Sequence, residues 1–372
     1  MRPSFESWLE TRLAELEAAR LLRTPLLVQG QGPEVVVDGR TLINFAGNDY
    51  LGLGALAAAE APPSASASRL VTGHGPAHQA LEASLATFLG YPSSLCFSSG
   101  YAANVGTLAA LVGPNDIIFS DRLNHASLID GCRLSRARVV IFDHASPSSL
   151  EALLDKERSE GDRAWIVTES LFSMDGDAAP LPAFARLAAQ HDAQLFVDEA
   201  HAIGVCGPGG RGLCAAQGVT PDVLIGTLGK SLGSQGAFVA GSERLIAFLW
   251  NRARSFVFST GLSPILAQTA LRNLSLLKDD GLRAHLRQLS ERLSAGVAQG
   301  AWEHRTGPGA IHSLLLGDPA TALAKAQATL EHGILVRAIR PPTVPKGTSR
   351  LRVVLSAFHT TDHVDRLLRA LQ

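Results

Sequence analysis

The chain has 372 residues, a formal net charge of -1 at pH 7, 46% hydrophobic residues and 18% charged residues. This length and composition predict a compact globular protein with one large domain and a smaller one, and argue against a disordered or fibrous chain. The near-zero charge gives no reason to expect binding to nucleic acid or to an anionic membrane. The four cysteines are too few for a disulfide scaffold and form no Cys-x-x-Cys pair, so we expect buried thiols and no metal site.

The N-terminal residues predict a helix rather than a targeting segment. Residues 4–23 carry apolar side chains at near-helical spacing, which indicates an amphipathic helix that lies across some other surface. Glu6 and Glu10 interrupt the region where a signal peptide has an unbroken apolar core. No later apolar run is long enough to span a bilayer, so we expect a cytoplasmic protein.

A hairpin and a polar loop follow. Residues 34–45 consist of two apolar runs around an Asp-Gly turn, which predicts two antiparallel strands. The next segment, Asn44-Phe-Ala-Gly-Asn-Asp-Tyr-Leu-Gly-Leu, mixes polar and aromatic residues as binding loops do.

Helical patterns alternate with short apolar runs from residue 78 onwards. Strands are predicted at 94–97, 116–120, 138–142, 164–168 and 194–197, and helices at 78–89, 102–111, 148–158 and 182–190. This alternation predicts an α/β fold, with a mostly parallel sheet and helices on both faces. A long helical region at 264–298, a helix at 319–332 and strands at 334–337 and 349–355 predict a small C-terminal α/β domain.

The domain organisation predicted from these patterns has three parts. Residues 1–41 form an N-terminal helix and strand, residues 42–270 form the large domain, and residues 271–372 form the small C-terminal domain. The strands of the large domain end in polar residues, namely Ser98, Asp121, Asp143, Glu169 and Asp198. Since the carboxyl ends of parallel strands line one edge of a sheet, and ligands bind at that edge, these residues mark the expected site.

Two glycine-rich motifs suggest nucleotide binding but lack the required context. Gly229-Lys-Ser resembles the end of a phosphate-binding P-loop, yet Leu224 stands where that motif needs a glycine. Gly207-Pro-Gly-Gly-Arg-Gly matches the dinucleotide pattern, yet it contains a proline and lacks the acidic residue expected about twenty positions later. Neither nucleotide site is therefore favoured.

Lys230 lies in a glycine-rich turn between two apolar runs. Taken alone it is most simply a solvated surface lysine. Together with Asp198, His201 and Thr227, however, it matches the needs of pyridoxal phosphate, whose aldehyde requires a lysine and whose ring nitrogen requires a carboxylate. The strand, glycine turn and helix around Ser98-Ser-Gly-Tyr would present backbone amides to the phosphate, and His125 could stack on the ring.

Ordered motifs over nearly the whole chain resemble the pyridoxal-phosphate-dependent α-oxoamine synthases. They are the polar loop at 44–53, His78-Gln-Ala-Leu-Glu, Ser99-Gly-Tyr-Ala-Ala-Asn, Asp121-Arg-Leu-Asn-His-Ala-Ser, Phe172-Ser-Met-Asp-Gly-Asp, Asp198-Glu-Ala-His and Thr227-Leu-Gly-Lys. The resemblance implies fold type I of the pyridoxal-phosphate enzymes, the aspartate aminotransferase-like fold. Residues 64–69 depart from the family, whose members are usually richer in glycine there.

The segment Ala338–Arg352 is similar to the family member of biotin biosynthesis. That similarity implies an acyltransferase that condenses L-alanine with a pimeloyl thioester, carried by coenzyme A or by a carrier protein, and releases carbon dioxide. It also implies a homodimer with shared active sites. A sister enzyme that condenses glycine with acetyl-CoA is the alternative. A binding or regulatory module on the same fold is disfavoured because the lysine, the acid and the arginine of the site are all present.

The resemblance assigns roles to particular residues of this chain. Lys230, His125 and His201 would be catalytic. The cofactor would be bound by Lys230, Asp198, His201, Ser173, Thr227, Gly100, Tyr101 and His125, with Ser259 and Thr260 reaching it from a second subunit. The substrate would contact Arg23, Asn48, His125, Thr343 and Arg352.

Overall fold

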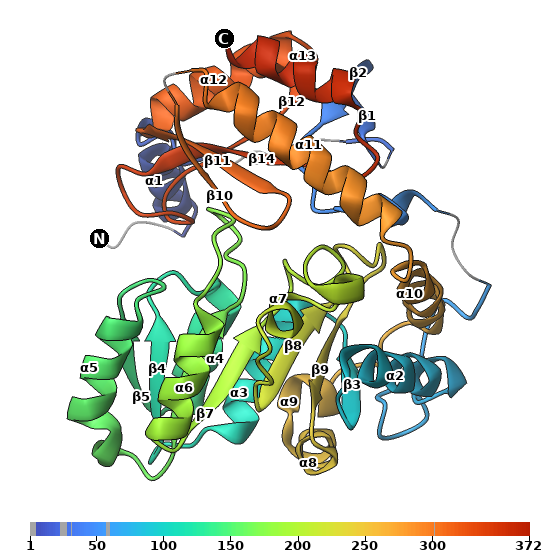
Figure 1. Cartoon of the computed structure of the whole chain (residues 1–372), viewed down its shortest axis with the longest axis vertical. Helices are drawn as coiled ribbons and strands as arrows, with labels where there is room; N and C mark the ends of the chain where they lie inside the picture. Colours follow the sequence, from blue (N-terminus) through green and yellow to red (C-terminus); the bar gives the residue numbers. More distant parts are fainter. Residues whose placement is uncertain (1–4, 23–27, 31, 57–59, 301) are drawn as a thin grey trace.

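The computed structural model describes the chain except for residues 1–4, 23–27, 31, 57–59 and 301. The larger part is built on a seven-stranded sheet in the order β3-β9-β8-β7-β6-β4-β5. Its strands are β3 (Ser93–Phe97), β4 (Ile117–Asp121), β5 (Arg138–Phe142), β6 (Ala164–Glu169), β7 (Ala193–Asp198), β8 (Val223–Thr227) and β9 (Ala237–Gly241). The smaller part stacks on the larger one along the long axis of the molecule (Figure 1).

The sheet is mostly parallel, as the sequence predicts. Strands β5, β4, β6, β7 and β8 pair in parallel. Strand β9 is antiparallel to both of its neighbours, β8 and β3.

Both faces of the sheet are buried under helices. Along β4, Ile117 and Phe119 join one hydrophobic cluster while Ile118 joins another, as expected where alternate side chains point to opposite faces. The helices of this part are α2 (Pro76–Leu89), α3 (Gly100–Leu111), α4 (Ala126–Ser135), α5 (Pro147–Glu157), α6 (Leu181–Gln190), α7 (Leu213–Ala216), α8 (Glu243–Arg252), α9 (Arg254–Val257) and α10 (Pro264–Leu276). Short 3-10 helices occur at Leu53–Ala55, Arg158–Glu160 and Pro208–Gly210.

The smaller part contains two sheets. One has the order β10-β11-β14-β13 and the other has the order β1-β2-β12. Their strands are β1 (Glu34–Val37), β2 (Arg40–Asn44), β10 (Glu303–Thr306), β11 (Ile311–Gly317), β12 (Ile334–Leu335), β13 (Arg337–Ile339) and β14 (Ser349–Val354). The helices are α11 (Gly281–Val297), α12 (Pro319–Glu331) and α13 (Thr361–Leu371). Strand β2 pairs with β12 and crosses the predicted boundary between residues 41 and 42, and the three-part division stays a prediction.

The long helical region predicted at 264–298 consists of two helices. Helix α10 ends at Leu276 and α11 begins at Gly281. Between them the Asp279 carboxylate accepts a hydrogen bond from the Gly281 backbone N–H at 2.8 Å. Such side-chain bonding to nearby backbone competes with the helical pattern and favours a turn.

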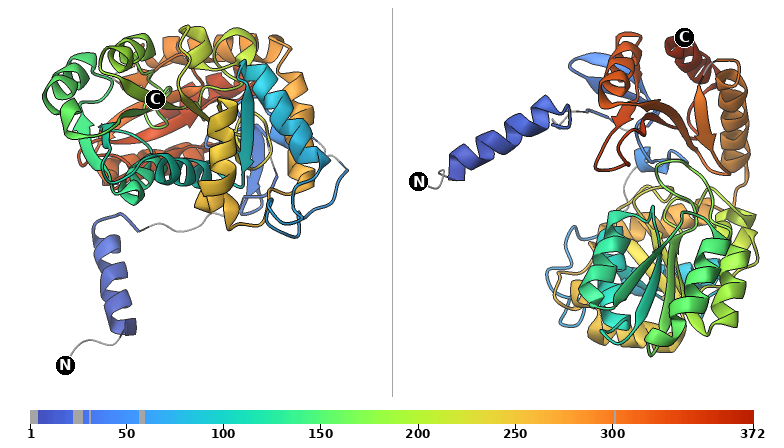
Figure 2. Two further views of the ribbon diagram at one scale, coloured as in Figure 1. Left: turned by 90° about the horizontal axis from the view of Figure 1, so that it is seen from below. Right: turned by 90° about the vertical axis from the view of Figure 1, so that its left-hand side faces the viewer.

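Helix α1 (Phe5–Ala18) projects away from the rest of the chain (Figure 2). The side chains of Leu13 and Leu16 are 52% and 42% exposed. The sequence predicts this helix, and the surface that it lies across stays a prediction. Within the single chain, these two described leucines lack a covering surface.

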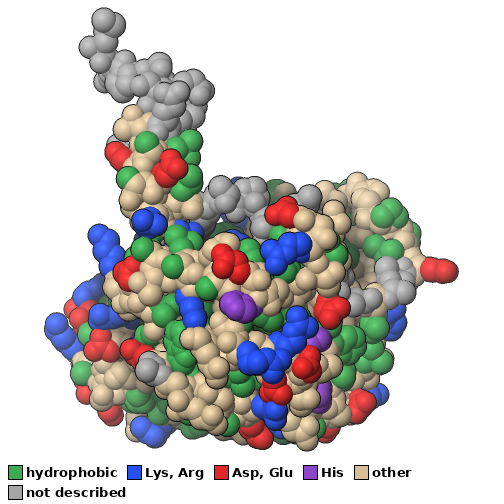
Figure 3. Space-filling model, turned by 90° about the horizontal axis from the view of Figure 1, so that it is seen from above, with side chains coloured by type: hydrophobic (Ala, Val, Ile, Leu, Met, Phe, Trp, Pro, Cys, Tyr) green, Lys and Arg blue, Asp and Glu red, His purple; other side chains and the backbone are tan. Residues whose placement is uncertain are grey.

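The four cysteines are buried and unpaired, which confirms their prediction as thiols. Within the described residues, no helix is long and apolar enough to cross a membrane and no cluster of three or more metal-ligating side chains occurs. On the face shown in Figure 3, Lys and Arg side chains are interspersed with Asp and Glu, as the near-zero net charge leads one to expect.

Candidate active site

The carboxyl ends of four adjacent strands bring most of the predicted residues to one edge of the sheet. Strand β4 leads to His125, β6 to Ser173, β7 to Asp198 and His201, and β8 to Lys230. These ends point toward the smaller part of the molecule (Figure 1). The site therefore lies between the two parts, where fold rules for open parallel sheets place it.

Lys230 begins a chain of hydrogen bonds. Its Nζ lies 2.7 Å from Nε2 of His201, whose Nδ1 lies 2.6 Å from the hydroxyl of buried Tyr50. The Tyr50 hydroxyl donates to Oδ1 of Asn48 at 3.3 Å. If Lys230 donates, His201 carries its proton on Nδ1 and donates to Tyr50, so every link has one donor and one acceptor.

Burial favours the neutral forms of Lys230 and His201. Burial lowers the pKa of Lys230 to about 8, with Arg352 adding to the effect and Asp198 and Glu169 opposing it. Burial also moves the pKa of His201 well below its usual value, aided by Lys230 and Arg352. At neutral pH the site thus combines a neutral imidazole with an amine that is partly unprotonated.

Both carboxylate oxygens of Asp198 accept hydrogen bonds, which favour its charged form. One carboxylate oxygen accepts from the Asn104 side-chain amide at 2.7 Å, and the other accepts from the Ala200 backbone N–H at 2.8 Å. The same Asn104 amide donates to the Ser127 hydroxyl at 2.9 Å. Ser127 in turn lies 2.8 Å from Nδ1 of His125, so one amide links the acid to the ring expected beside it.

His125 is anchored from its backbone. Its N–H donates to Oε1 of fully buried Glu169 at 2.7 Å. Burial lowers the pKa of His125, with Lys230 lowering it further and Asp198 raising it. Burial raises the pKa of Glu169 to about 8, with Asp198 adding to the rise and Lys230 opposing it.

Arg352 on β14 connects the smaller part to the site. Its Nε donates to the Ser173 carbonyl at 2.6 Å, and its two terminal nitrogens donate to Oδ1 of Asn48 at 3.1 and 3.0 Å. Thr343 is exposed and lies near Arg352, on the wall of a cavity of about 270 Å³. The structure thus joins Lys230, His201, Asn48, Arg352 and Ser173 in one network.

The start of helix α3 is open to an anion. Ser99 caps the helix by accepting from the Ala102 N–H at 3.1 Å, and a Cβ atom placed on Gly100 would meet nothing within 4 Å. Tyr101 is half-exposed and its hydroxyl donates to Asp130. The Thr227 hydroxyl donates to the Gly236 carbonyl at 3.1 Å and accepts from the Gly229 N–H at 3.2 Å.

These features fit a phosphorylated pyridine aldehyde. The reactive amine of Lys230 and the fixed carboxylate of Asp198 suit its aldehyde and its ring nitrogen. The open helix N-terminus at Gly100 suits its phosphate. Each group would be met by a donor or an acceptor of the required kind.

Ser259 and Thr260 lie outside this network in the single chain. Thr260 is exposed, and its backbone pairs with Ser68 in an isolated bridge. Ser259 beside it is partly exposed. Their predicted role across a dimer interface stays a prediction, and Arg23 lies outside the described residues.

Sequence reasoning gave Glu169 no role beyond its place at a strand end, and it missed Tyr50 and Asn104 as members of this site. Tyr50 and Asn104 lie in segments that the sequence singles out, and Glu169 is one of the polar strand ends. Their partners are far away in sequence, since Tyr50 and His201 are 151 positions apart. Only their position in these segments could have suggested them.

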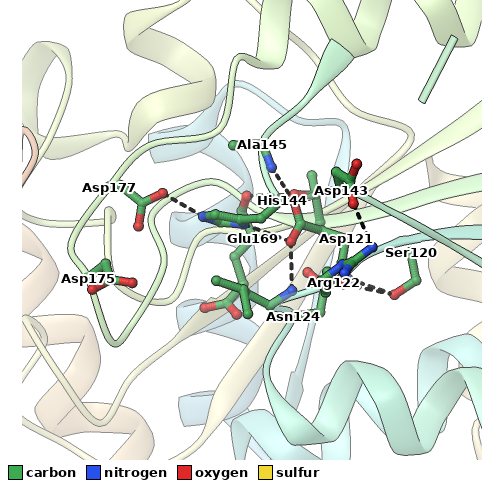
Figure 4. A network of polar contacts seen from close by, with 12 residues as sticks. Ser120, Asp121, Arg122, Asn124, Asp143, His144, Ala145, Glu169, Asp175 and Asp177 are labelled. Carbon is green, nitrogen blue, oxygen red and sulfur yellow. Dashed lines mark hydrogen bonds and ion pairs between the residues drawn. The ribbon is translucent and has the colours of Figure 1, made fainter. Parts of the chain in front are cut away.

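A third histidine stabilises the edge of the site. His144 lies between two carboxylates, 2.9 Å from Asp121 and 2.7 Å from Asp177, in the network of Figure 4. Burial lowers its pKa, but hydrogen bonds to Asp121 and Asp177 outweigh this and raise the pKa to about 10. The imidazolium thereby ties the loop that contains Ser173 to the end of β4.

We expect His144→Gln to destabilise the protein by about 2 kcal/mol at neutral pH, since two carboxylates lose a charged donor. The folded pKa of about 10 exceeds the usual 6.5, so the contribution is full below pH 6.5 and is lost as pH rises toward 10. Urea unfolding of both proteins near these two pH values measures it. An effect of equal size at both, or the same loss in the exposed control His332→Gln, would contradict the charged link.

The fold and the network at Lys230 define a pyridoxal-phosphate-dependent enzyme of fold type I. Comparison with known proteins agrees, since the sequence profile of the aminotransferase class I and II family matches residues 40–371. The 8-amino-7-oxononanoate synthase of Marinobacter nauticus is 47% identical over 96% of this chain and 94% of its own. That of Anaeromyxobacter dehalogenans is 49% identical over 98% of this chain and 94% of its own. The chain therefore belongs to the aminotransferase class I and II family and, within it, to the 8-amino-7-oxononanoate synthases.

Solved structures show the same fold. Serine palmitoyltransferase of Sphingomonas wittichii has a TM-score of 0.89 and 31% identity, covering 99% of this chain and 96% of its own. The 8-amino-7-oxononanoate synthase of Francisella tularensis has a TM-score of 0.75 and 28% identity, covering 89% of this chain and 96% of its own.

Proposed function

We propose that this protein condenses L-alanine with a pimeloyl thioester to give 8-amino-7-oxononanoate, the product that the names of its relatives specify. A carbon–carbon bond forms between the alanine Cα and the thioester carbonyl, the alanine carboxylate leaves as carbon dioxide, and the thiol is released. The supporting observation is the network that joins a partly neutral Lys230 to Arg352 through His201, Tyr50 and Asn48. One end of this network suits a proton acceptor and the other suits a carboxylate.

Pyridoxal 5'-phosphate is the cofactor, and when bound it supplies an aldehyde for an amine and a ring that withdraws electrons from the adjacent carbon. Lys230 would bind the aldehyde and Asp198 the ring nitrogen. His125 would stack on the ring, while Ser173 and His201 contact the ring oxygen. The phosphate would be bound by Gly100, Tyr101 and Thr227, with Ser259 and Thr260 of a second subunit.

Lys230 is also suited to act as the general base. Its pKa of about 8 lies close to neutral pH, which is the range where a base both accepts a proton and is free to do so. Its Nζ would remove the alanine Cα proton and later return one to the product carbon. Neutral His201, 2.7 Å away, would hold the amine in position and relay charge toward Tyr50.

Arg352 would bind the alanine carboxylate. A guanidinium presents two parallel N–H donors to a carboxylate, and here those donors contact the neutral amide oxygen of Asn48. A charged carboxylate would outcompete that neutral acceptor. Asn48, Thr343, His125 and Arg23 complete the proposed substrate side.

We further propose that the protein is a cytoplasmic homodimer with shared active sites. The exposed leucines of α1 support an assembly that covers this helix. The position of Thr260 at the surface of the single chain supports a role in a neighbouring subunit's site.

Steady-state assays of product and carbon dioxide, with alanine or glycine against pimeloyl-CoA, a pimeloyl-carrier protein and acetyl-CoA, test the proposed function. We expect kcat/KM for alanine with a pimeloyl thioester to exceed that for glycine with acetyl-CoA by about 100-fold. One extra or missing methylene in an apolar pocket changes kcat/KM by about 10- to 200-fold. Higher efficiency with glycine and acetyl-CoA would instead assign the sister reaction.

The pH dependence of cofactor loading tests the state of Lys230. Only a neutral amine attacks an aldehyde, so the initial rate of pyridoxal phosphate uptake by the cofactor-free protein should rise about tenfold per pH unit below pH 8 and level off above it. The visible absorbance of the bound cofactor reports the rate. A rate that still rises steeply up to pH 10.5, the usual pKa of lysine, would contradict the lowered value.

A further inference from the structure

A second cavity, of about 260 Å³, opens beside the site. We call it the acyl cavity. Its walls come from three segments that are far apart in sequence, at residues 122–129, 172–175 and 342–350. Ser173, whose carbonyl accepts from Arg352, and Asn124, which precedes His125, line it, so the cavity adjoins the network described above.

The wall of the acyl cavity is mainly apolar. Its apolar lining consists of Leu123, Ile129, Phe172, Met174, Val344 and two prolines. Phe172 and Val344 are almost fully buried. Such a wall suits an alkyl chain, whereas the 270 Å³ cavity on the other side of Thr343 is lined by three arginines and suits charged groups.

Two arginines line the acyl cavity, and they differ in how firmly other residues of the protein bind them. Arg350 is buried and ion-paired with buried Asp175, and its Nε donates to the Thr348 carbonyl at 2.9 Å. Asp175 is also 3.5 Å from Arg305. If the Arg350 guanidinium moved away, the buried Asp175 carboxylate would be poorly paired. Arg350 is therefore not free to bind a ligand.

Arg122 is held only loosely. Its side chain is 61% exposed and pairs at 2.5 Å with Asp143, which is itself 65% exposed (Figure 4). Exposed pairs of this kind contribute little free energy. The Arg122 backbone is fixed by its bond to the Phe142 carbonyl at 3.2 Å, so its guanidinium can exchange Asp143 for another carboxylate while the chain stays in place.

We propose that the acyl cavity binds the alkyl chain of a dicarboxylic acid thioester and that Arg122 binds its distal, free carboxylate. The thioester end then lies beside Ser173 and His125, and the charged end lies at the exposed rim. This rests on the proposed function and specifies its acyl substrate: an unesterified dicarboxylate, rather than a monocarboxylic acyl chain or a half-ester.

The test compares pimeloyl-CoA with its distal monomethyl ester as acyl donors for the cofactor-loaded protein. The wild-type kcat/KM should be about threefold higher for the free acid, because a single exposed ion pair contributes little free energy. In Arg122→Gln this preference should disappear through a higher KM for the acid, with the ester changed less than twofold. Asp143→Asn removes the competing carboxylate and should lower the KM for the acid alone. The control is Arg292→Gln, which removes an exposed arginine of α11 that pairs with Asp365 of α13. It should change kcat/KM for neither the acid nor the ester.

Product formation from acid and ester with equal kcat/KM in the wild type would overturn this inference and leave the proposed function intact. Equal losses for both donors in Arg122→Gln would overturn it too, because a structural role affects both alike. Failure of every pimeloyl thioester to give product would instead overturn the proposed function, and the inference with it.

Discussion

Replacing Lys230 by alanine is expected to lower kcat/KM for the condensation by about 10³-fold or more. The amine is proposed both to bind the cofactor and to move the alanine Cα proton, and a positioned general base alone contributes 10²- to 10⁴-fold. His201, 2.7 Å away, is the nearest alternative base. Its pKa lies well below the usual value, so it accepts a proton poorly and should not replace the lysine.

Two measurements separate the functions of Lys230. Gel filtration followed by cofactor analysis should show that the alanine variant loses pyridoxal phosphate on dilution whereas the wild type retains it. Steady-state rates then report the loss of proton transfer. Lys278→Ala, at an exposed lysine beyond α10, is the matched control and should behave as wild type. Full condensing activity in Lys230→Ala would refute the mechanism.

Replacing Arg352 by lysine is expected to raise the KM for L-alanine about 100-fold. Losing one partner of a buried charged pair costs 2–5 kcal/mol, and lysine cannot reproduce a bidentate contact. Arg352 is 7% exposed and also holds the Ser173 carbonyl through Nε at 2.6 Å. The substitution therefore removes both the bidentate donor pair for the alanine carboxylate and the hydrogen bond to the loop of Ser173.

Varying each substrate in turn distinguishes these effects. Loss of the carboxylate contact alone should raise the KM for alanine and leave that for the pimeloyl thioester within about threefold, since Arg352 does not line the acyl cavity. Binding of pyridoxal phosphate should persist. An unchanged KM for alanine would exclude Arg352 as its carboxylate ligand.

The buried ion pair between Arg350 and Asp175 explains why the acyl cavity can be built from both parts of the molecule. Arg350 lies on β14 of the smaller part and Asp175 follows β6 of the larger part. The neighbouring residue on the same strand face, Arg352, contacts Ser173 in the same loop. Arg350 and Arg352 therefore hold one loop together, Arg350 through the Asp175 carboxylate and Arg352 through the Ser173 backbone carbonyl.

Local patterns in the chain were sufficient for the order of strands and helices and for the main chemical groups. The apolar runs before Asp198 and before Lys230 can only be buried strands, because both faces of a parallel sheet are covered. Parallel strands end at one edge, so the acid, the lysine and His125 had to meet there. The resemblance of the motifs to the α-oxoamine synthases added the residues of the smaller part, including Arg352.

Three features depended on tertiary contacts. The place of Tyr50 between His201 and Asn48, the support of Asp198 by Asn104, and the loose pairing of Arg122 at an apolar cavity all join segments far apart in sequence. The lowered pKa of Lys230 is of the same kind, since burial produces it. A sequence pattern records which groups are available, but their distances and desolvation arise only when the two parts of the chain pack together.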